Sequence, residues 1–321
     1  MERRALMRII EYTHPQAVEL SKVKTAMALG LFDGVHIGHR ALISETVRIA
    51  SERELVPAVM TFPQDSEGLK TGVVRIYSTE EKLRIFEELG IELVFLVDFP
   101  SVSHLLGEEF VSDVLCRRMG CRIALAGEDF RFGYKASADS AMLSSYMSSA
   151  GGEAIIHKME RYSFSGGESV EVSASLIRGY LSSGEIERAC ALLGAPYTVR
   201  SVVVRGIGLG HTLGFPTVNT DIKDGSPLAL GVYETRVRIG EKSYTGLTNV
   251  GVCPTFGARG VHAETFILDY SGELYDEAVD ISFVRFIRPE REFSSADELR
   301  AEIEENIKTV KRGRRDLSRE V

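Results

Sequence analysis

The 321-residue sequence has few of the residues and runs that mark several large classes of protein. Its four cysteines are Cys116, Cys121, Cys190 and Cys253, and none forms a Cys-x-x-Cys pair or has a histidine at zinc-finger spacing. We therefore expect reduced, mostly buried thiols and no zinc site. The N-terminal residues mix charges with apolar side chains, and no later apolar run is long enough to span a membrane. This pattern fits no signal peptide and favours a cytoplasmic protein.

Basic residues are fewer than acidic residues in this sequence. The sequence has 38 lysines and arginines against 46 aspartates and glutamates, which gives a formal net charge of −8 at pH 7. This balance argues against a surface dedicated to the phosphates of DNA or RNA, but it leaves room for a small anionic ligand. The only charge run is KRGRR at 311–315, for which we expect a solvated terminus. We expect small-molecule substrates, no nucleic-acid or membrane partner, and a monomer or weak homo-oligomer.

The two halves of the chain differ in their order of predicted helices and strands. From residue 26 to about 160, apolar strand-like runs alternate with amphipathic helical ones, which predicts a doubly wound parallel α/β sheet. The helical segments SASLIRGYLSSG and EIERACALLG follow and stop at Gly194, so we place the domain boundary near 195. Short strands and turns then predict a small antiparallel barrel or sandwich, closed by a helix at about 294–310. The predicted domains are 1–195 and 196–321.

The stretch DGVHIGH at 33–39 connects a predicted strand to a predicted helix. His36 and His39, three residues apart at the helix N-terminus, can both face a ligand held by the free backbone N–H groups. Gly34 and Gly38 let the backbone approach that ligand without a Cβ in between. Phosphate suits such a site. In isolation the same letters also fit turn glycines beside capping or surface histidines.

The longer stretch GLFDGVHIGH at 30–39 resembles the GxFDGxHxGH signature of nucleotidyltransferases. It is most similar to the flavin-specific form, the FMN adenylyltransferase domain of bacterial riboflavin kinase/FAD synthetases. The resemblance implies that these residues bind ATP and stabilise the charge on its α-phosphate. The ATP-binding residues would be Gly30, Phe32, Asp33, Gly34 and Gly38, and the catalytic ones His36 and His39.

Two later segments resemble the same family in the same order. AGEDFRFGYKASAD at 126–139 resembles its flavin-binding segment, and VSASLIRG at 172–179 resembles its SSTxIR box. The resemblance implies flavin binding by Gly127, Asp129 and Phe130, ATP binding by Ser173 and Ser175, and catalysis by Arg178 at the leaving pyrophosphate. Two departures are that MTFPQDSEG lacks the histidine of the family's TFxPHP segment and that Ala174 replaces a serine. Losing one hydroxyl slows a reaction about tenfold.

The stretch GHTLGFPTVN at 210–219 resembles the GRxLGFPTAN signature of the riboflavin kinase domain, with His211 in place of arginine. Its glycines do not fit a dinucleotide-binding turn, because no strand–helix unit or acidic partner follows. The resemblance implies that Gly210, Thr217 and Asn219 bind ATP and that Thr217, with Asn219 nearby, binds Mg²⁺. It also makes Glu264 the general base and places Arg288 at the flavin. Because histidine is nearly neutral at pH 7, we expect a weaker or pH-dependent ATP affinity.

The whole pattern predicts an α/β nucleotidyltransferase domain followed by a small antiparallel β-barrel kinase domain with a C-terminal helix. The expected chemistry is phosphorylation of riboflavin to FMN and adenylylation of FMN to FAD, with ATP and Mg²⁺. The adenylyl transfer is an in-line attack that requires positioning and charge neutralisation rather than a covalent intermediate. Two alternatives remain open: a riboflavin kinase with an impaired N-terminal domain, and a catalytically silent flavin-binding module.

Overall fold

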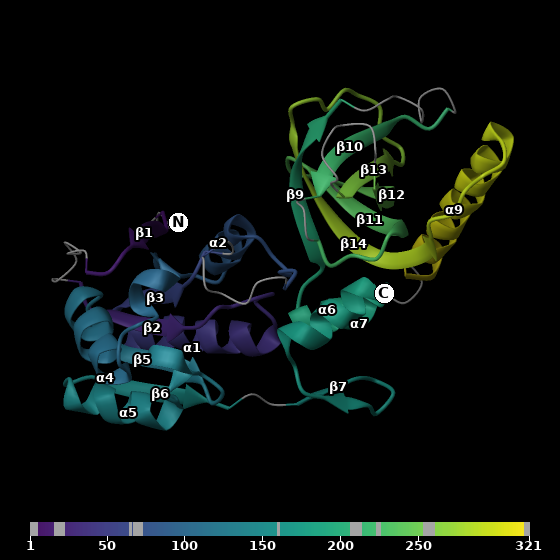
Figure 1. Ribbon diagram of the computed structural model, residues 1–321. Helices are drawn as coiled ribbons and strands as arrows, with labels where there is room; N and C mark the ends of the chain where they lie inside the picture. The colour runs from purple at the N-terminus through teal and green to yellow at the C-terminus, as the bar shows by residue number, and fades with distance from the viewer. Residues whose placement is uncertain are drawn as a thin grey trace. The chain divides into compact units, whose positions relative to one another are not determined.

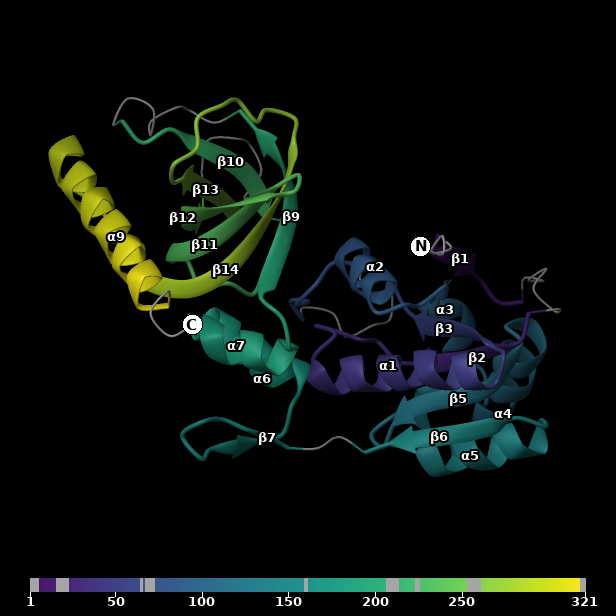
Figure 2. The ribbon, with the colours of Figure 1, turned by 180° about the vertical axis from the view of Figure 1, so that it is seen from behind.

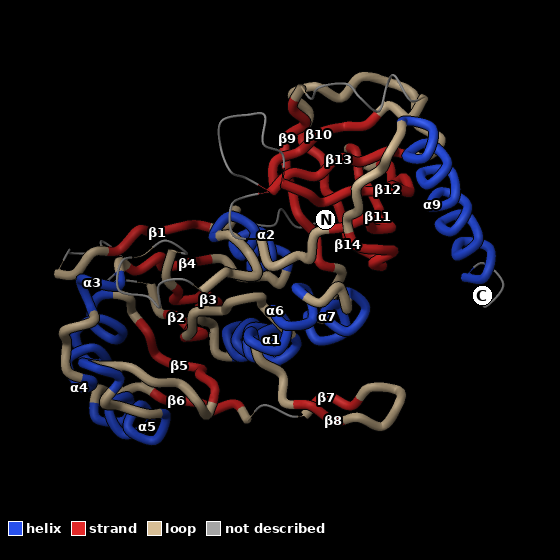
Figure 3. Tube along the Cα trace, turned by 45° about the vertical axis from the view of Figure 1, so that its right-hand side comes forward, coloured by secondary structure: helices blue, strands red, loops and turns tan. Residues whose placement is uncertain are grey.

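The structure is a computed structural model that describes residues 6–15, 23–63, 66, 73–158, 161–205, 214–222, 226–252 and 261–317 (Figure 1). Its contacts divide the chain into two compact units, Met1–Ala174 and Ser175–Val321. We call these the N-terminal and C-terminal units and describe each by itself. Figure 3 shows that helices and strands mix in the N-terminal unit, whereas strands dominate the part of the C-terminal unit that is drawn in colour.

The N-terminal unit is built on a six-stranded sheet in the order β1-β4-β3-β2-β5-β6. Its strands are β1 (Arg8–Tyr12), β2 (Thr25–Leu29), β3 (Val56–Thr61), β4 (Leu93–Val97), β5 (Cys121–Gly127) and β6 (Glu153–His157). Every neighbouring pair is parallel. The predicted doubly wound parallel sheet is confirmed, and the stretch predicted to bind phosphate leaves the sheet at the C-terminal end of β2, where such sheets bind ligands.

The helices of this unit follow the predicted alternation with the strands. They are α1 (Ile37–Glu52), α2 (Thr79–Glu88), α3 (Phe99–Val102), α4 (Gly107–Glu109), the π-helix η1 (Phe110–Arg118), the short 3₁₀ turn η2 (Tyr134–Ala136) and α5 (Ser140–Ser149). Helix α2 begins with a capping box, in which Ser78 accepts from the Glu81 N–H and the Glu81 carboxylate accepts from the Ser78 N–H. This cap fixes where the chain turns back toward the sheet.

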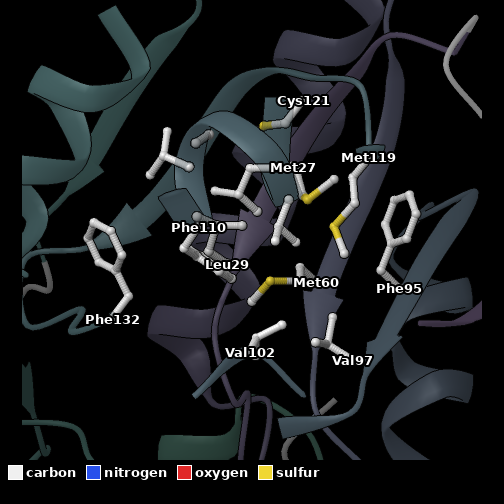
Figure 4. Packing of buried hydrophobic residues seen from close by; sticks show 14 of the residues in the cluster. Met27, Leu29, Met60, Phe95, Val97, Val102, Phe110, Met119, Cys121 and Phe132 are labelled. Carbon is white, nitrogen blue, oxygen red and sulfur yellow. The ribbon is translucent and has the colours of Figure 1, made fainter. Parts of the chain in front are cut away.

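Hydrophobic cores lie on both faces of the sheet because successive strand side chains point to opposite sides. Ala26 and Ala28 pack with residues of α1 and α2, whereas Met27 and Leu29 pack with residues of η1 and α5. Figure 4 shows the second cluster, where Met27, Leu29 and Met60 from the strands meet Phe110 from η1. The strands are therefore apolar on both faces, as parallel sheets require.

The C-terminal unit is a closed antiparallel barrel in the order β10-β13-β12-β11-β14-β9 (Figure 2). Its strands are β9 (Tyr197–Val204), β10 (Thr217–Ile222), β11 (Gly231–Ile239), β12 (Lys242–Val252), β13 (Val261–Ile267) and β14 (Ala278–Pro289). The buried hydroxyls of Thr235, Thr248 and Thr265 form a chain of hydrogen bonds, with oxygens 2.8 and 2.9 Å apart. The predicted barrel is confirmed, and its polar interior is satisfied from strand to strand.

Helix α9 (Ala296–Leu317) packs on the outer face of this barrel through Val310, which meets Val232, Leu247 and Leu268. Ser295 caps it by accepting from the Glu298 N–H at 3.2 Å, as SSADEL predicts. The helix begins two residues later than predicted and extends seven residues further. The charged run at 311–315 continues this helix, and Lys311 and Arg312 are exposed, in line with the expectation of a solvated terminus.

Helices α6 (Ala174–Ser182) and α7 (Ile186–Leu193) precede the barrel, and Gly194 ends α7 in the left-handed conformation at φ 69°. The contacts divide the chain between Ala174 and Ser175, which groups nearly all of α6 and all of α7 with the C-terminal unit. The domain boundary near residue 195 stays a prediction. The sequence analysis missed β1 and the hairpin of β7 (Tyr162–Ser163) and β8 (Ser169–Val170). Within the described part of the chain, no helix combines the length and apolarity needed to cross a membrane.

Candidate functional site

The turn between β2 and α1 has an unusual backbone. Phe32, Gly34 and Val35 all have positive φ, at 52°, 81° and 39°. Such a conformation costs about 1–3 kcal/mol at a residue other than glycine, so the surroundings must hold the turn in place. At Gly34 an alanine would be strained by the positive φ, and its Cβ would lie 2.7 Å from Ile76 Cδ1, so the Ile76 side chain would have to shift. The glycine of the signature thus suits both the backbone conformation and the close packing of this turn.

Asp33 connects the same turn to the segment before α2. Its carboxylate is buried, accepts a hydrogen bond from the Ile76 N–H at 3.0 Å and lies 3.9 Å from the Arg75 guanidinium. Asp33 therefore fixes the turn from inside the protein. The ATP-binding role assigned to it, as to Gly30 and Phe32, remains a prediction.

His36 and His39 lie together at the start of α1. Their rings stack with centroids 3.6 Å apart and an angle of 17° between planes. His36 is the N-cap, and its Nδ1 accepts from the His39 N–H at 3.4 Å. Burial lowers the pKa of His36 to about 4. Burial, followed by the charges of His36 and Lys82, holds the pKa of His39 well below its usual range.

The two imidazoles are consequently neutral at pH 7 before a ligand binds. Because Nδ1 of His36 is an acceptor, the proton of the neutral ring lies on Nε2, which can therefore serve as a donor. Nδ1 of His39 is buried and has no hydrogen-bond partner among the described residues. Gly38 is the second residue of α1, where backbone N–H groups have no partner inside the helix. Neutral imidazole donors above a helix N-terminus suit the oxygens of a polyphosphate.

Lys82 is a buried residue of this site that the sequence analysis did not identify. It lies on α2 with 3% of its surface exposed, and its Nζ donates to the carbonyl oxygens of Leu31 and Phe62, both at 3.1 Å. Burial lowers the pKa of Lys82 to about 8, while Asp33 raises it and Arg75 lowers it further. The sequence does contain a sign that Lys82 is buried. Lys82 stands one helical turn before Phe86 on the buried side of α2, where a charged residue is unusual.

A cavity of about 440 Å³ lies in the N-terminal unit, where Met60 at the end of β3 and the segment 130–136 line it. Aromatic side chains dominate its wall, which includes Phe62, Phe99, Phe110, Phe130, Phe132 and Tyr134. Phe130, predicted to bind flavin, stacks on Phe132 with centroids 5.5 Å apart and an angle of 20° between planes. Asp129 is exposed and is not among the described lining residues, and Gly127 is not among them either. An aromatic slot of this volume suits a planar heterocycle.

The residues of the SSTxIR-like box are placed at the start of α6. Ser173 precedes this helix, and Arg178 Nη2 donates to Ser175 Oγ at 2.9 Å. The structure thus brings Ser175 and Arg178 together within the C-terminal unit. Their assigned roles at the phosphates of ATP remain predictions.

A second cavity, of about 270 Å³, lies between the outer face of the barrel and α9. Thr217 on β10 and Glu264 on β13 line it, as does Asn249 on β12, which the sequence analysis missed. Asn219 is not among the described lining residues, but it lies directly opposite Glu264 in the strand register. Because directly opposed residues share a face, Asn219, Asn249 and Glu264 all project from the outer side of the barrel. Gly210, His211 and Cys253 lie outside the described residues.

Arg288 and the C-terminal helix form another part of this cavity. Arg288 Nε lies 3.0 Å from Glu302 Oε1, and its guanidinium lies 5.5 Å from the centre of the Phe293 ring. Asn306 on α9 also lines the cavity, although only 5% of its surface is exposed. Its Nδ2 has no hydrogen-bond partner among the described residues. The predicted Arg288 and the unpredicted Asn306 thus offer polar groups in a largely apolar cavity.

Comparison with known proteins assigns each unit to a family. The FAD synthetase family model matches residues 19–170, and the riboflavin kinase family model matches residues 193–313. A bifunctional riboflavin kinase/FMN adenylyltransferase of Bacillus subtilis is 32% identical over 309 residues, covering 94% of this chain and 96% of its own. The Escherichia coli K12 protein of the same description is 34% identical over 282 residues, covering 86% and 88%.

A solved structure described as a macrolide-efflux protein from Streptococcus pneumoniae has a TM-score of 0.80 at 28% identity. The match covers 94% of this chain and 98% of that one, so both units have counterparts in it. The two family models, the length of the sequence matches and the order of the motifs agree. The chain belongs to the family of bifunctional riboflavin kinase/FMN adenylyltransferases.

Proposed function

We propose that the chain makes FAD in two ATP-dependent steps, phosphorylating riboflavin to FMN and then transferring an adenylyl group to FMN. The observation that carries this proposal is that each unit matches one of the two family models and has a cavity bordered by residues of its own motif. The cavity of the N-terminal unit contains Phe130, from the segment that resembles the family's flavin-binding one. The cavity of the C-terminal unit contains Thr217 and Glu264.

In the kinase step, Glu264 acts as the general base. Its carboxylate accepts the proton of the ribityl 5′-hydroxyl as that oxygen attacks the γ-phosphorus of ATP, and ADP leaves. The strand register supports this role, because Asn219 and Asn249 flank Glu264 on the outer face of the barrel. Two amides beside a carboxylate can orient a hydroxyl and a phosphate oxygen without adding negative charge. Arg288 and Asn306 contribute polar contacts along the flavin-binding part of the cavity.

Mg²⁺ fits the residues of this site as a companion of ATP. The hydroxyl of Thr217 and the amide oxygen of Asn219 lie on one face of β10 and are hard oxygen ligands. Within the described ranges there is no group of three or more histidine, cysteine, aspartate or glutamate side chains that could hold a metal. A few neutral oxygens suit an ion that keeps waters and phosphate oxygens as its other ligands. When bound, Mg²⁺ neutralises part of the phosphate charge.

In the adenylyl transfer step, an FMN phosphate oxygen attacks the α-phosphorus of ATP and pyrophosphate leaves. The neutral imidazoles of His36 and His39 donate hydrogen bonds to phosphate oxygens, together with the free N–H groups at the start of α1. Phe130 stacks on the flavin ring in the aromatic cavity, next to Phe132. Gly127 and Asp129 shape the turn that leads to Phe130, whose N–H donates to the Gly127 carbonyl at 3.1 Å. Ser173, Ser175 and Arg178 bind the phosphates of ATP, as the family resemblance implies.

The test is chromatography of the flavins formed from riboflavin, and separately from FMN, with ATP and Mg²⁺. Wild-type protein should yield FMN and FAD from riboflavin, and FAD from FMN. Glu264→Gln should lose both products from riboflavin but still form FAD from FMN, whereas His36→Ala should form FMN from riboflavin but no FAD from either flavin, which assigns each step to its unit. FMN without FAD would restrict catalysis to the kinase. The absence of both products would contradict the proposal and favour a silent flavin-binding module.

The cellular setting and assembly state are proposals of the same kind. Both steps consume ATP, which supports a cytoplasmic location. We propose a monomer or weak homo-oligomer, with small molecules rather than nucleic acids as its partners. Cell fractionation and light scattering over a range of protein concentrations test these points.

A further inference from the structure

Lys82 uses its ammonium group at the ends of two neighbouring strands. It donates to Leu31 O just beyond β2 and to Phe62 O just beyond β3, both at 3.1 Å. The third contact is with Thr61 Oγ1 at 3.5 Å, and this hydroxyl donates in turn to Leu31 O at 3.1 Å. An ammonium has three hydrogens, so these contacts use its full donor capacity. The side chain therefore connects two backbone segments rather than pairing with one carboxylate.

The two connected segments belong to different parts of the adenylyl transfer site. Leu31 directly precedes Phe32, where the strained phosphate-binding turn begins. Phe62 lines the aromatic cavity, and its ring meets Phe99 edge-on at 5.2 Å. One buried side chain thus joins the backbone that holds the nucleotide to the backbone that forms the flavin wall. A shift of about 1 Å between two reacting groups can reduce a rate 100-fold, so such a connection bears directly on catalysis.

A buried ammonium is an expensive way to fill this position. Transfer of a charge from water to the interior is unfavourable unless hydrogen bonds and neighbouring charges compensate for it. A methionine would fit the buried side of α2, next to Phe86, without that penalty. What methionine lacks is the capacity to hold the Leu31 and Phe62 carbonyls together. The charge at Lys82 therefore has a purpose beyond packing.

We propose that Lys82 is a positioning residue for adenylyl transfer, which holds the phosphate-binding turn and the wall of the flavin cavity at a fixed separation. This inference rests on the proposed function of the N-terminal unit. It assigns to α2 a role in the reaction, although α2 carries none of the signature residues. Lys82 touches neither ligand in this account and acts through Leu31 and Phe62.

The charges near Lys82 support a pH signature for this role. Asp33 from the turn favours the ammonium, whereas Arg75 from the segment before α2 disfavours it, and Lys82 in turn lowers the pKa of His39 on α1. Burial is the largest influence and lowers the pKa of Lys82 to about 8. The ammonium is therefore present at pH 7 and is lost as the pH rises through about 8. Arginine stays protonated throughout this range.

The experiment compares wild-type protein with Lys82→Met, Lys82→Arg and the matched control Lys158→Met, whose side chain is exposed on the same unit. We expect Lys82→Met to lower kcat/KM for FAD formation about 100-fold, with riboflavin phosphorylation unchanged. Calorimetric titrations with FMN and with a non-hydrolysable ATP analogue should both show weaker binding. Wild-type FAD formation should decline above about pH 8, and the residual activity of Lys82→Arg should not. Lys158→Met should match wild type.

Three outcomes would overturn the inference. One is wild-type kcat/KM and affinities in Lys82→Met, another is weaker binding of only one ligand, and the third is an identical alkaline decline in Lys82→Arg. Hydrogen exchange in α1 at the assay temperature distinguishes a folded variant from an unfolded one. If Lys82→Met does not fold, the pH dependence of a folded Lys82→Arg still tests the inference. If wild-type protein makes no FAD, the proposed function fails, and the two binding titrations still decide whether Lys82 couples the subsites.

Discussion

Acid should destabilise the N-terminal unit through His36, because burial lowers the pKa of this imidazole to about 4. In the unfolded chain the same side chain titrates near 6.5. Between these two values the unfolded state binds a proton that the folded state rejects. Stability is therefore complete above about pH 6.5 and declines as the pH falls toward 4.

The size of the effect follows from the separation of the two pKa values. Each pH unit between them costs about 1.4 kcal/mol, so His36 alone removes about 2 kcal/mol from the unfolding free energy between pH 7 and pH 5. His36→Asn is the matched variant, because asparagine is a good N-cap and can still accept from the His39 N–H. It does not titrate. The variant should lose about 2 kcal/mol less than wild type over the same pH interval.

The chain has no tryptophan, so hydrogen exchange with mass spectrometry is a better assay than fluorescence. Exchange of α1 peptides across a urea series gives the unfolding free energy of the N-terminal unit at each pH. Peptides from β11 provide an internal reference in the C-terminal unit. Parallel pH dependences for α1 in wild type and His36→Asn would refute the reasoning, since they would mean that His36 is not desolvated in the folded protein.

Three other substitutions have clear expected outcomes. Gly34→Ala should slow FAD formation from FMN but spare riboflavin phosphorylation in the chromatographic assay, because alanine is strained at φ 81° and its Cβ would displace Ile76 Cδ1; unchanged FAD formation would show that the turn tolerates a Cβ. Glu264→Gln should lower kcat of the kinase step about 100- to 10,000-fold with little change in KM for ATP, and a loss confined to KM would argue against a general base. Gly231→Ala should lower the unfolding temperature of the barrel in calorimetry, because its Cβ would overlap the Arg288 carbonyl oxygen. An unchanged transition would show that the backbone where β11 meets β14 can relax.

Local sequence patterns were sufficient to predict most of the helices and strands. The apolar runs around Met27 and Met60 identify buried parallel strands, and Gly194 marks the end of α7 through its left-handed backbone. The strand β1 escaped prediction because Arg8 and Glu11 interrupt its apolar pattern. What makes it a strand is its parallel pairing with residues 93–97, which no local window contains.

The candidate site was predictable to a similar degree. Sequence motifs identified His36, His39 and Glu264, whose spacing within a signature carries information. Lys82 and Asn306 were missed, since each belongs to a site only through contacts made across the fold. Both stand on the apolar stripe of a helix, one turn from Phe86 and Ile303 respectively. A polar residue on an apolar helix stripe is the sequence feature that could have identified Lys82 and Asn306 as candidate site residues.

The two sheets also differ in whether their hydrogen bonding is complete. The barrel closes on itself, so each of its six strands has a neighbour on both sides. Among the described strands, the parallel sheet of the N-terminal unit ends at β1 and β6, and Ile9 on β1 is 48% exposed. Unpaired backbone groups at such a margin can accept a strand from another chain. Self-association of the folded enzyme by strand pairing at high concentration should therefore involve the edge strands of the adenylyltransferase unit rather than the closed barrel.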